Sequence, residues 1–521
     1  MEDIVMKNYD YKQPRRFIYI AGLLVFILGL FPSVKLLYGE IVADNGVLTD
    51  KEILELTAKE ALQALAGGEL TAVRYVDVLL ARAAQYGDYN AFIYLDPAQV
   101  RAAAVQSDQA RASGEPIGPL HGLPIVFKDN INTADMPTTG GTPALTYNQP
   151  SSNAVVVQTL LDAGAIAMGK VNLHELAGGV TSNNPTFGTV RNPYDSSRIP
   201  GGSSGGNAAA VAGRMVSVGI GTDSGGSIRI PASLCGIVGF RPTKGRYSHD
   251  GIIKLSDTRS TSGPMTRSVA DAILIDAVLT GDSPKLDAAQ LEGLRLGVPR
   301  RYFYENLHTD VDKEIEKALQ RLTQAGVILV EADMPDIRTL VAASSFPILL
   351  YESIFGVNQY LADQNTGLDY AALASQVVSP GVQELMFSAL YLMSTGMLPL
   401  YYDAAINVYR PAMQWNYSQY FANNNVEAIL IPTTILPAAK IGNENTVHLN
   451  GQDLPIVETY MQNTDPGSII GIPGISLPVG LTAEKLPVGL ELDGPAGSDR
   501  RLLAIALAIE AEMPRLPPPE M

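Results

Sequence analysis

Two segments rich in glycine and serine hold the residue types from which nucleophilic catalysis can be built. They are residues 201–207 (GGSSGGN) and residues 219–231 (GIGTDSGGSIRIP). Glycine allows positive φ and close approach of a substrate to the backbone. Successive N–H groups in such turns can point at one spot and bind an anion. Attack of a serine hydroxyl on a carbonyl carbon generates an oxyanion that needs those donors, so the segments favour a nucleophilic hydrolase.

A serine nucleophile needs a base, and no histidine lies in or near either segment. Lys128 follows the apolar run 123–127 (LPIVF), which has the composition of a short buried strand. Burial disfavours the ammonium form and can lower a lysine pKa by up to about 3–5 units, so that neutral Lys128 could accept a proton. On the residues alone, a phosphate-binding loop and a purely structural loop stay open, although the Gly-Lys-Ser/Thr and GxGxxG patterns are absent.

Helical and strand-like segments alternate around these motifs, which is typical of an α/β core whose sheet is covered by helices on both faces. No linker interrupts residues 50–510, so we expect a single catalytic domain, followed by a disordered proline-rich tail at 511–521. Residues 340–425 are mainly helical and rich in Tyr and Met. We expect them to shape the substrate pocket, although core packing alone would account for most of these side chains. The expected helices are residues 58–65, 73–84, 154–163, 265–280 and 310–327, and the expected strands are residues 123–127, 166–169, 327–330, 428–431, 471–479 and 487–492.

The amino terminus carries an apolar run at residues 17–34, preceded by Lys12, Arg15 and Arg16. At ~1.5 Å rise per residue such a run just crosses a bilayer core of ~30 Å. The preceding basic residues predict a cytoplasmic amino end and an extracytoplasmic catalytic domain. We expect residues 1–40 to form an uncleaved hydrophobic anchor helix, because no good cleavage site follows. A cleaved signal segment, a helix docked on the enzyme and a cytoplasmic protein are the alternatives.

Composition narrows the class of function. The 521-residue chain carries a formal net charge of −16, which argues against nucleic-acid binding because like charges repel. Its one cysteine, Cys235, excludes an intrachain disulfide and lies in an apolar run, so we expect a buried thiol. No HExxH or CxxC pattern is present, and we expect neither a metal nor an organic cofactor.

Several longer motifs resemble the amidase signature family across nearly all of residues 50–510. The two glycine- and serine-rich segments resemble its signature, and residues 122–129 (GLPIVFKD) resemble its lysine motif. Further matching motifs are residues 172–175 (NLHE), 191–193 (RNP), 239–243 (GFRPT), 263–265 (GPM) and 471–478 (GIPGISLP). The resemblance implies a mixed-sheet α/β fold, amide hydrolysis through an acyl-enzyme, and a Ser-cisSer-Lys triad.

The resemblance also implies a role for each matching position. Ser227 is the expected nucleophile, Lys128 the expected base, and Ser203 the expected proton carrier between them, with a cis peptide bond before Ser203. The backbone N–H groups expected to form the oxyanion hole are those of Ser224, Gly225, Gly226 and Ser227. Asp223, Arg229 and Ser204 are expected to hold the surrounding loops, with loop packing alone as the alternative for these three.

Residues 191–216, 234–252 and 258–281 are most similar to the indoleacetamide and mandelamide hydrolase branch of that family. Members of the branch cleave primary amides of arylacetic acids, which makes such a small-molecule amide the expected substrate. A fatty acid amide hydrolase, a peptide amide hydrolase and the amidase subunit of a glutamyl-tRNA amidotransferase are alternatives. A membrane-tethered binding protein without catalysis is another, and the sequence leaves a homodimer open.

Overall fold

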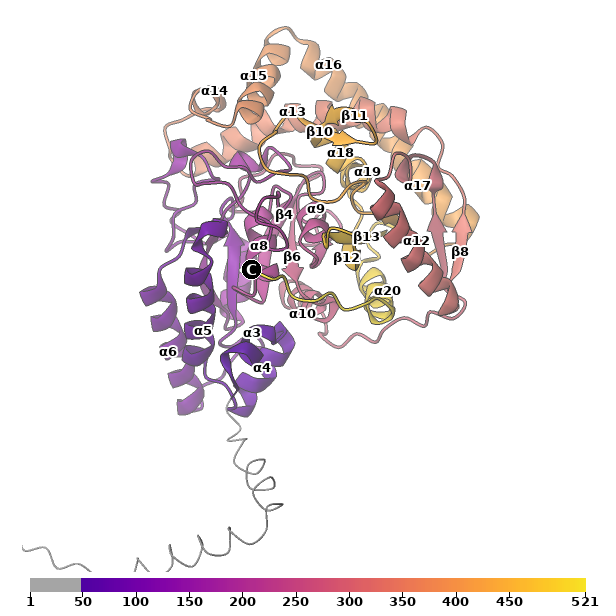
Figure 1. The fold of residues 1–521 in the computed structure, drawn as a ribbon. Coiled ribbons are helices and arrows are strands. Elements are labelled where there is room, and N and C mark those ends of the chain that lie inside the picture. The colour runs from indigo at the N-terminus through magenta and orange to yellow at the C-terminus, as the bar shows by residue number, and fades with distance from the viewer. Residues whose placement is uncertain (1–47) are drawn as a thin grey trace, which may run out of the picture. The chain divides into compact units, whose positions relative to one another are not determined.

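The computed structural model describes residues 48–521, and its central element is an 11-stranded mixed sheet (Figure 1). The strand order along the sheet is β1-β3-β2-β4-β6-β5-β12-β13-β9-β7-β8. The strands are β1 (Phe92–Tyr94), β2 (Pro124–Lys128), β3 (Ile166–Val171), β4 (Val218–Asp223), β5 (Val238–Arg241), β6 (Thr261–Thr266), β7 (Arg295–Val298), β8 (Ile328–Glu331), β9 (Ala428–Pro432), β12 (Gly474–Leu481) and β13 (Pro487–Asp493). β10 (Thr446–Leu449) and β11 (Gln452–Pro455) form a separate two-stranded sheet.

The parallel part of the sheet determines where the two signature motifs meet. β2 pairs in parallel with β3 on one side and with β4 on the other. Every residue of β2 and β4 is buried, and both strands are apolar or glycine until their polar C-terminal ends. Parallel strands end at the same edge of a sheet. Because Lys128 ends β2 and Asp223 ends β4, this edge brings the lysine motif to the second glycine-rich segment.

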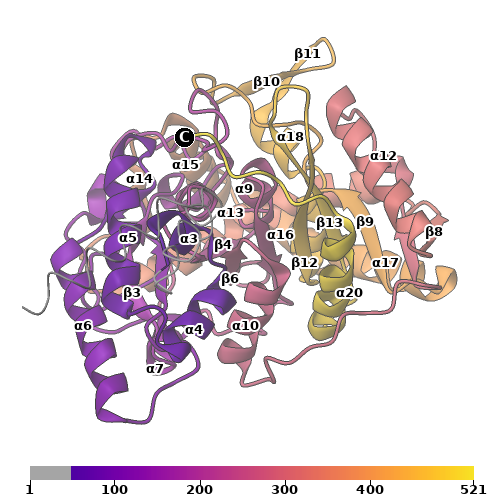
Figure 2. The same ribbon diagram turned by 60° about the horizontal axis from the view of Figure 1, so that its bottom comes forward.

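Helices pack on the sheet in two groups. The helices are α3 (Asp50–Glu55), α4 (Ala58–Gly67), α5 (Ala72–Gln85), α6 (Pro97–Ser113), α7 (Val155–Asp162), α8 (Gly205–Ala212), α9 (Arg229–Leu234), α10 (Val269–Thr280), α11 (Arg300–Phe303), α12 (Thr309–Gln324), α13 (Ile337–Asp363), α14 (Tyr370–Ala374), α15 (Pro380–Ser394), α16 (Met397–Ala404), α17 (Arg410–Asn424), α18 (Ile456–Met461), α19 (Thr464–Ile470) and α20 (Asp499–Glu512). α8 and α9 contact each other and the central strands, whereas α10 and α12 contact α20 and also lie against central strands. Figure 2 shows α10 and α20 in front of the sheet. The sheet is therefore covered on both faces, as the sequence predicts.

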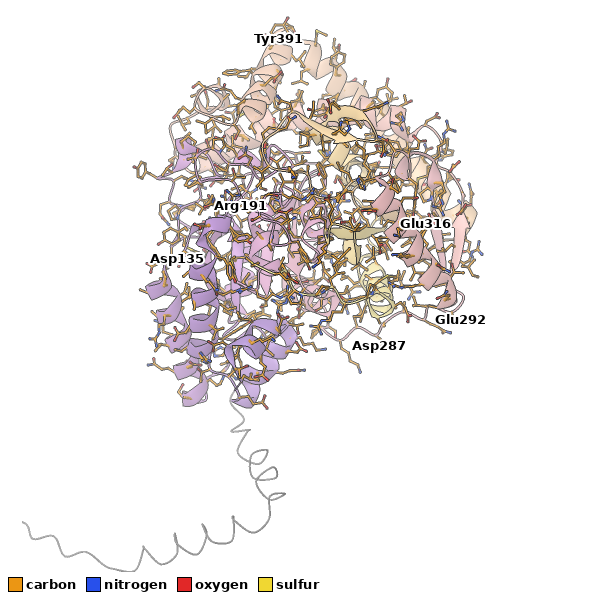
Figure 3. The ribbon with its side chains drawn as sticks, in the orientation of Figure 1. Asp135, Arg191, Asp287, Glu292, Glu316 and Tyr391 are labelled. Atoms are coloured by element: carbon orange, nitrogen blue, oxygen red, sulfur yellow. The ribbon has the colours of Figure 1, made fainter. Side chains whose placement is uncertain are left out.

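The region between residues 337 and 424 is mainly helical, as expected, and its helices α13 to α16 lie at the top of Figure 1. Among residues 48–521, α13 is the one helix long and apolar enough to cross a membrane, but 56% of its apolar window is buried inside the fold. Its Glu352 accepts hydrogen bonds from Ser256, Thr258 and Tyr402. Tyr391 on α15 is 67% exposed at the outer end of this region (Figure 3). α13 is thus placed like a core helix, and part of the Tyr-rich surface faces outward.

Two expectations differ from the structure. The helix predicted at 265–280 begins only at Val269, because residues 261–266 pair with β4 and extend the sheet first. The tail predicted to be disordered, 511–521, instead begins with the end of α20 and continues along the surface. There Tyr86 Oη donates to the carbonyl of Met521 at 3.1 Å, and Tyr194 Oη donates to that of Pro517 at 3.0 Å. These contacts give the proline-rich tail a fixed path. The predicted anchor helix, residues 1–40, lies outside the described residues.

Candidate active site

Lys128 and Ser203 are hydrogen-bonded where the parallel strands end. Lys128 Nζ lies 2.7 Å from Ser203 Oγ and 2.9 Å from Thr222 Oγ1, and all three residues are buried. Lys128 belongs to β2 and Thr222 to β4, while Ser203 lies in the loop before α8, which packs on both strands. The structure therefore brings together the base and the bridging serine that the sequence predicts.

The surroundings of Lys128 favour a neutral amine. Burial lowers the pKa of Lys128 to about 7, and the negative charge of Asp223 opposes this only in part. A neutral amine has two N–H groups and one lone pair. Thr222 offers two acceptors to Nζ, its hydroxyl at 2.9 Å and its carbonyl oxygen at 3.4 Å. With both N–H groups directed to Thr222, the lone pair is left to accept the proton of Ser203.

The loop that carries Ser203 is held by hydrogen bonds from a side chain to its main chain. The peptide bond Gly202–Ser203 is cis, which confirms the expectation from the resemblance. Ser182 Oγ donates to the carbonyl of Gly201 at 2.9 Å and accepts from the N–H of Gly205 at 3.1 Å. Ser182 thus clasps the loop on either side of Ser203, a role that the sequence analysis missed.

Ser227 lies on the second loop, between β4 and α9, and is partly exposed. The two loops are joined by the N–H of Ser204, which donates to the carbonyl of Ser227 at 3.2 Å. Within residues 48–521, the Ser227 hydroxyl has no hydrogen-bond partner, and it lies on the wall of a cavity. Hydrogen bonds of catalytic groups often tighten only when substrate binds, so this arrangement is compatible with a nucleophile beside the Lys128–Ser203 pair.

The four N–H groups expected in the oxyanion hole do not behave alike. The N–H groups of Ser224, Gly225 and Ser227 have no acceptor in the described part of the chain, and the same three residues line the cavity. The prediction for Gly226 is wrong in this respect, because its N–H donates to Asp223 Oδ1 at 2.8 Å. Gly226 has a φ of +128°, a region that favours glycine. Its glycine identity serves the turn, and three donors remain for an oxyanion.

The three residues predicted to support the loops all contact them. Asp223 accepts from Arg229 Nε at 3.1 Å and from the N–H of Ile228 at 3.2 Å. Burial disfavours ionisation of Asp223, but the charges of Arg229 and Arg241 outweigh it and hold its pKa well below the usual range. Ser204 Oγ donates to the carbonyl of Thr222 at 3.2 Å. The ionised Asp223 therefore organises the nucleophile loop, and Ser204 ties the two loops to β4.

Several contacts at the site come from residues that the sequence analysis did not predict. Arg241 Nη1 donates to the carbonyl of Asp223 at 2.7 Å, and Arg259 Nε donates to that of Ser224 at 2.9 Å. Thr464 Oγ1 donates to the carbonyl of Gly225 at 2.6 Å. Arg241 lies inside the GFRPT motif, which could have marked it. Arg259 and Thr464 come from segments with no pattern that points to the nucleophile loop.

The cavity beside Ser227 has a volume of about 330 Å³. Its side walls are mostly apolar and come from α13, α15, α18 and loops near β4. The apolar side chains include Val180, Leu255, Phe346, Leu349, Leu385 and Met461. Among residues 48–521, no group of three or more His, Cys, Asp or Glu side chains could hold a metal ion. The geometry offers a buried proton-accepting pair, a serine at a cavity wall and three unpaired N–H donors, which together can perform acyl transfer.

Comparison with known proteins gives the same assignment. Residues 74–503 match the family model described as Amidase. The chain is 42% identical over 453 residues to the indoleacetamide hydrolase of Agrobacterium vitis, covering 87% of this chain and 96% of that protein. It is 38% identical over 483 residues to the mandelamide hydrolase of Pseudomonas putida, covering 90% and 94%.

Solved structures agree in fold. A crystal structure of an amidase has a TM-score of 0.79 at 33% identity and covers 88% of this chain and 100% of its own. The peptide amidase of Stenotrophomonas maltophilia has a TM-score of 0.78 at 31% identity, covering 89% and 98%. The family match over residues 74–503 agrees with Ser227 and the unpaired N–H donors at the cavity wall and with the buried Lys128–Ser203 pair. The chain therefore belongs to the amidase signature family and is an amide-hydrolysing enzyme.

Proposed function

We propose that this amidase hydrolyses the primary amide of an arylacetic acid to the acid and ammonia, with Ser227, Ser203 and Lys128 as the catalytic triad. The observation that carries the triad is the 2.7 Å contact between Lys128 Nζ and Ser203 Oγ, in a buried site where the amine pKa is about 7. A base with a pKa near the working pH combines the right protonation state with sufficient basicity.

The reaction proceeds through an acyl-enzyme. Neutral Lys128 accepts the proton of the Ser203 hydroxyl, and Ser203 Oγ accepts that of Ser227 as Ser227 Oγ bonds to the amide carbon. The N–H groups of Ser224, Gly225 and Ser227 donate to the oxyanion. Collapse of the tetrahedral intermediate breaks the C–N bond, and the proton returns through Ser203 to the departing ammonia. Water then attacks the ester by the same proton path and releases the acid.

The cavity supports a small aromatic acyl group. Its volume of about 330 Å³ is at the small end of the ~300–1,000 Å³ usual for ligand sites. Phe346, Leu349 and Leu385 on its walls suit a flat apolar ring, and a long acyl chain would need more room. Relatives named for indoleacetamide and mandelamide match nearly the whole chain, which supports the same class of substrate.

Ammonia release by the purified full-length protein tests the proposal. The panel contains indole-3-acetamide, mandelamide, a short peptide amide, oleamide and glutamine. We expect turnover of the aryl amides, with kcat/KM reduced at least about 10³-fold in Ser227→Ala and in Lys128→Ala. Ser375→Ala is the matched control, because the exposed Ser375 hydroxyl donates to the carbonyl of Ala372 away from the cavity. Turnover of the peptide amide or oleamide alone would retain the triad and refute the aryl substrate, and full activity of Ser227→Ala would refute the triad.

We also propose that residues 1–40 anchor the enzyme in a membrane with the catalytic domain on the extracytoplasmic side. The support is the apolar run 17–34 and the basic residues before it. Carbonate extraction of membranes and protease treatment of intact cells test this. Release of the protein by carbonate would refute the anchor. Protection of the catalytic domain from protease would refute its orientation.

A further inference from the structure

Every backbone carbonyl of the nucleophile loop, residues 223–227, accepts a hydrogen bond from a fixed partner. The partners differ in kind, since two are arginine side chains, one is a threonine hydroxyl and two are backbone N–H groups. In chain order they are Arg241 Nη1 at 2.7 Å, Arg259 Nε at 2.9 Å, Thr464 Oγ1 at 2.6 Å, the N–H of Ile230 at 2.7 Å and the N–H of Ser204 at 3.2 Å. No peptide of this loop is free to turn over.

This pattern decides which way the N–H groups point. In a planar trans peptide the C=O and the following N–H point in opposite directions. Capture of the Ser224 carbonyl by Arg259 therefore directs the Gly225 N–H away from Arg259. Capture of the Gly225 carbonyl by Thr464 directs the Gly226 N–H toward Asp223, which accepts it at 2.8 Å. Within this loop, the N–H groups that have no acceptor among residues 48–521 are those of the residues that line the cavity.

Arg259 is engaged by the protein on all three of its side-chain nitrogens. Its side chain is fully buried, although the residue forms part of the cavity wall. Nε donates to Ser224, Nη1 donates to the carbonyl of Ser345 at 2.9 Å, and Nη2 pairs with Asp465. The guanidinium is thereby fixed from three directions. The Ser224 carbonyl is the group of the nucleophile loop that the Arg259 side chain holds, so we expect Arg259 to act on the reaction through the Ser224–Gly225 peptide.

We propose that Arg259 and Thr464 are positioning residues for the reaction, which hold the Ser224–Gly225 and Gly225–Gly226 peptides so that the Gly225 N–H meets the oxyanion. This inference rests on the proposed function of the same site. Donors fixed before the reaction stabilise developing charge without reorganising, and removal of one such donor typically costs about 10²–10³ in kcat. A donor that is tilted but retained should cost less.

The test compares Arg259→Lys and Thr464→Val with the wild-type protein on phenylacetamide. Lysine keeps a positive charge beside Asp465, but one ammonium cannot hold Ser224, Ser345 and Asp465 together. Valine preserves the shape of Thr464 and removes only its hydroxyl. For each variant we expect kcat to fall about 10- to 100-fold while KM changes less than about threefold.

Two ligands separate a positioning role from a structural one. Phenylacetaldehyde adds to a serine as a tetrahedral hemiacetal and uses the oxyanion donors, so its affinity should fall in step with kcat. Ethylbenzene fills the acyl site without an oxygen that could accept from the oxyanion donors, and its affinity should not change. Arg295→Lys is the matched control, because Arg295 Nε also donates to a backbone carbonyl, that of Asn425 at 3.0 Å, away from the cavity. It should leave kcat unchanged.

The inference is overturned if both variants retain wild-type kcat and aldehyde affinity, or if kcat and ethylbenzene affinity fall together. Thr464→Val decides the matter should Arg259→Lys fail to fold. An inactive wild-type protein, or an active Ser227→Ala variant, would instead refute the proposed function.

Discussion

Replacing Lys128 by methionine should remove a large part of the pH dependence of stability as well as the catalytic activity. Lys128 is fully buried, with a pKa lowered by burial from 10.5 to about 7. Methionine has a similar length and no charge. The change also removes the contacts to Ser203 and Thr222, but this cost does not vary with pH, so the pH dependence isolates the amine.

The sign follows from proton counting. Between about pH 7 and pH 10.5 the unfolded chain binds a proton on Lys128 that the folded protein does not, so the wild-type free energy of unfolding rises with pH. Below about pH 7 both states are protonated, and the full penalty is present without further change. At ~1.36 kcal/mol per pH unit, the wild type should gain about 3 kcal/mol relative to Lys128→Met between about pH 7 and pH 9.5.

Paired urea denaturation of the two proteins at both pH values measures this difference. Other titrating groups affect both proteins alike, so they cancel in the comparison. If the stability difference between wild type and Lys128→Met were the same at both pH values, the Lys128 pKa would not be depressed in the fold. A neutral lysine base at neutral pH would then be refuted, whatever the activity of the variant.

Three further results are expected. For a neutral amide substrate, kcat/KM should fall about tenfold per pH unit below about pH 7, because protonated Lys128 cannot accept a proton. This acidic limb of the kcat/KM profile should shift to lower pH on warming, because the pKa of an ammonium group falls with temperature. A limb that does not move with temperature would point to a carboxyl group instead. Gly226→Ala should lower kcat at least about 100-fold, because its Cβ would lie 2.1 Å from Thr464 Oγ1. Gly245→Ala is the control, since nothing lies within 4 Å there at a similarly positive φ of +89°, and equal effects of the two changes would contradict the steric argument. Thiol reagents should label Cys235 only in denaturant, because the residue is buried, and rapid labelling of the native protein would show otherwise.

The part of the site that lies on strands could be predicted from the sequence. The orientation of the individual peptides in the nucleophile loop could not. The apolar run before Lys128 identifies a buried strand, and burial of the amine follows from it. The pairing of Lys128 with Ser203 came from the family resemblance, because no spacing connects two distant segments. Glycines at 225 and 226 predict a tight turn but not the direction of each peptide, which explains the wrong expectation for the Gly226 N–H.

Contacts across the fold explain the other misses. Arg259 and Thr464 donate to main-chain carbonyls, and any residue with a suitable donor can do so, so the sequence holds no pattern for them. The start of α10 was predicted four residues early because residues 265 and 266 have no strand signal of their own. They extend β6 through pairing with β4. The path of the tail depends on Tyr86 and Tyr194, far away in the chain.

Part of the cavity wall is encoded in a different stretch of the chain from the triad. Lys128, Ser203 and Ser227 lie within about one hundred residues of each other and depend on the edge formed by β2 and β4. Further lining residues of the cavity come from α13, α15 and residues 444–461. Substitutions in these residues can therefore alter the preferred amide without changing the triad. Chimeras that exchange residues 337–461 between related amidases would make use of this modularity. Each chimera would keep the hydrolytic reaction and acquire the amide specificity of the other parent.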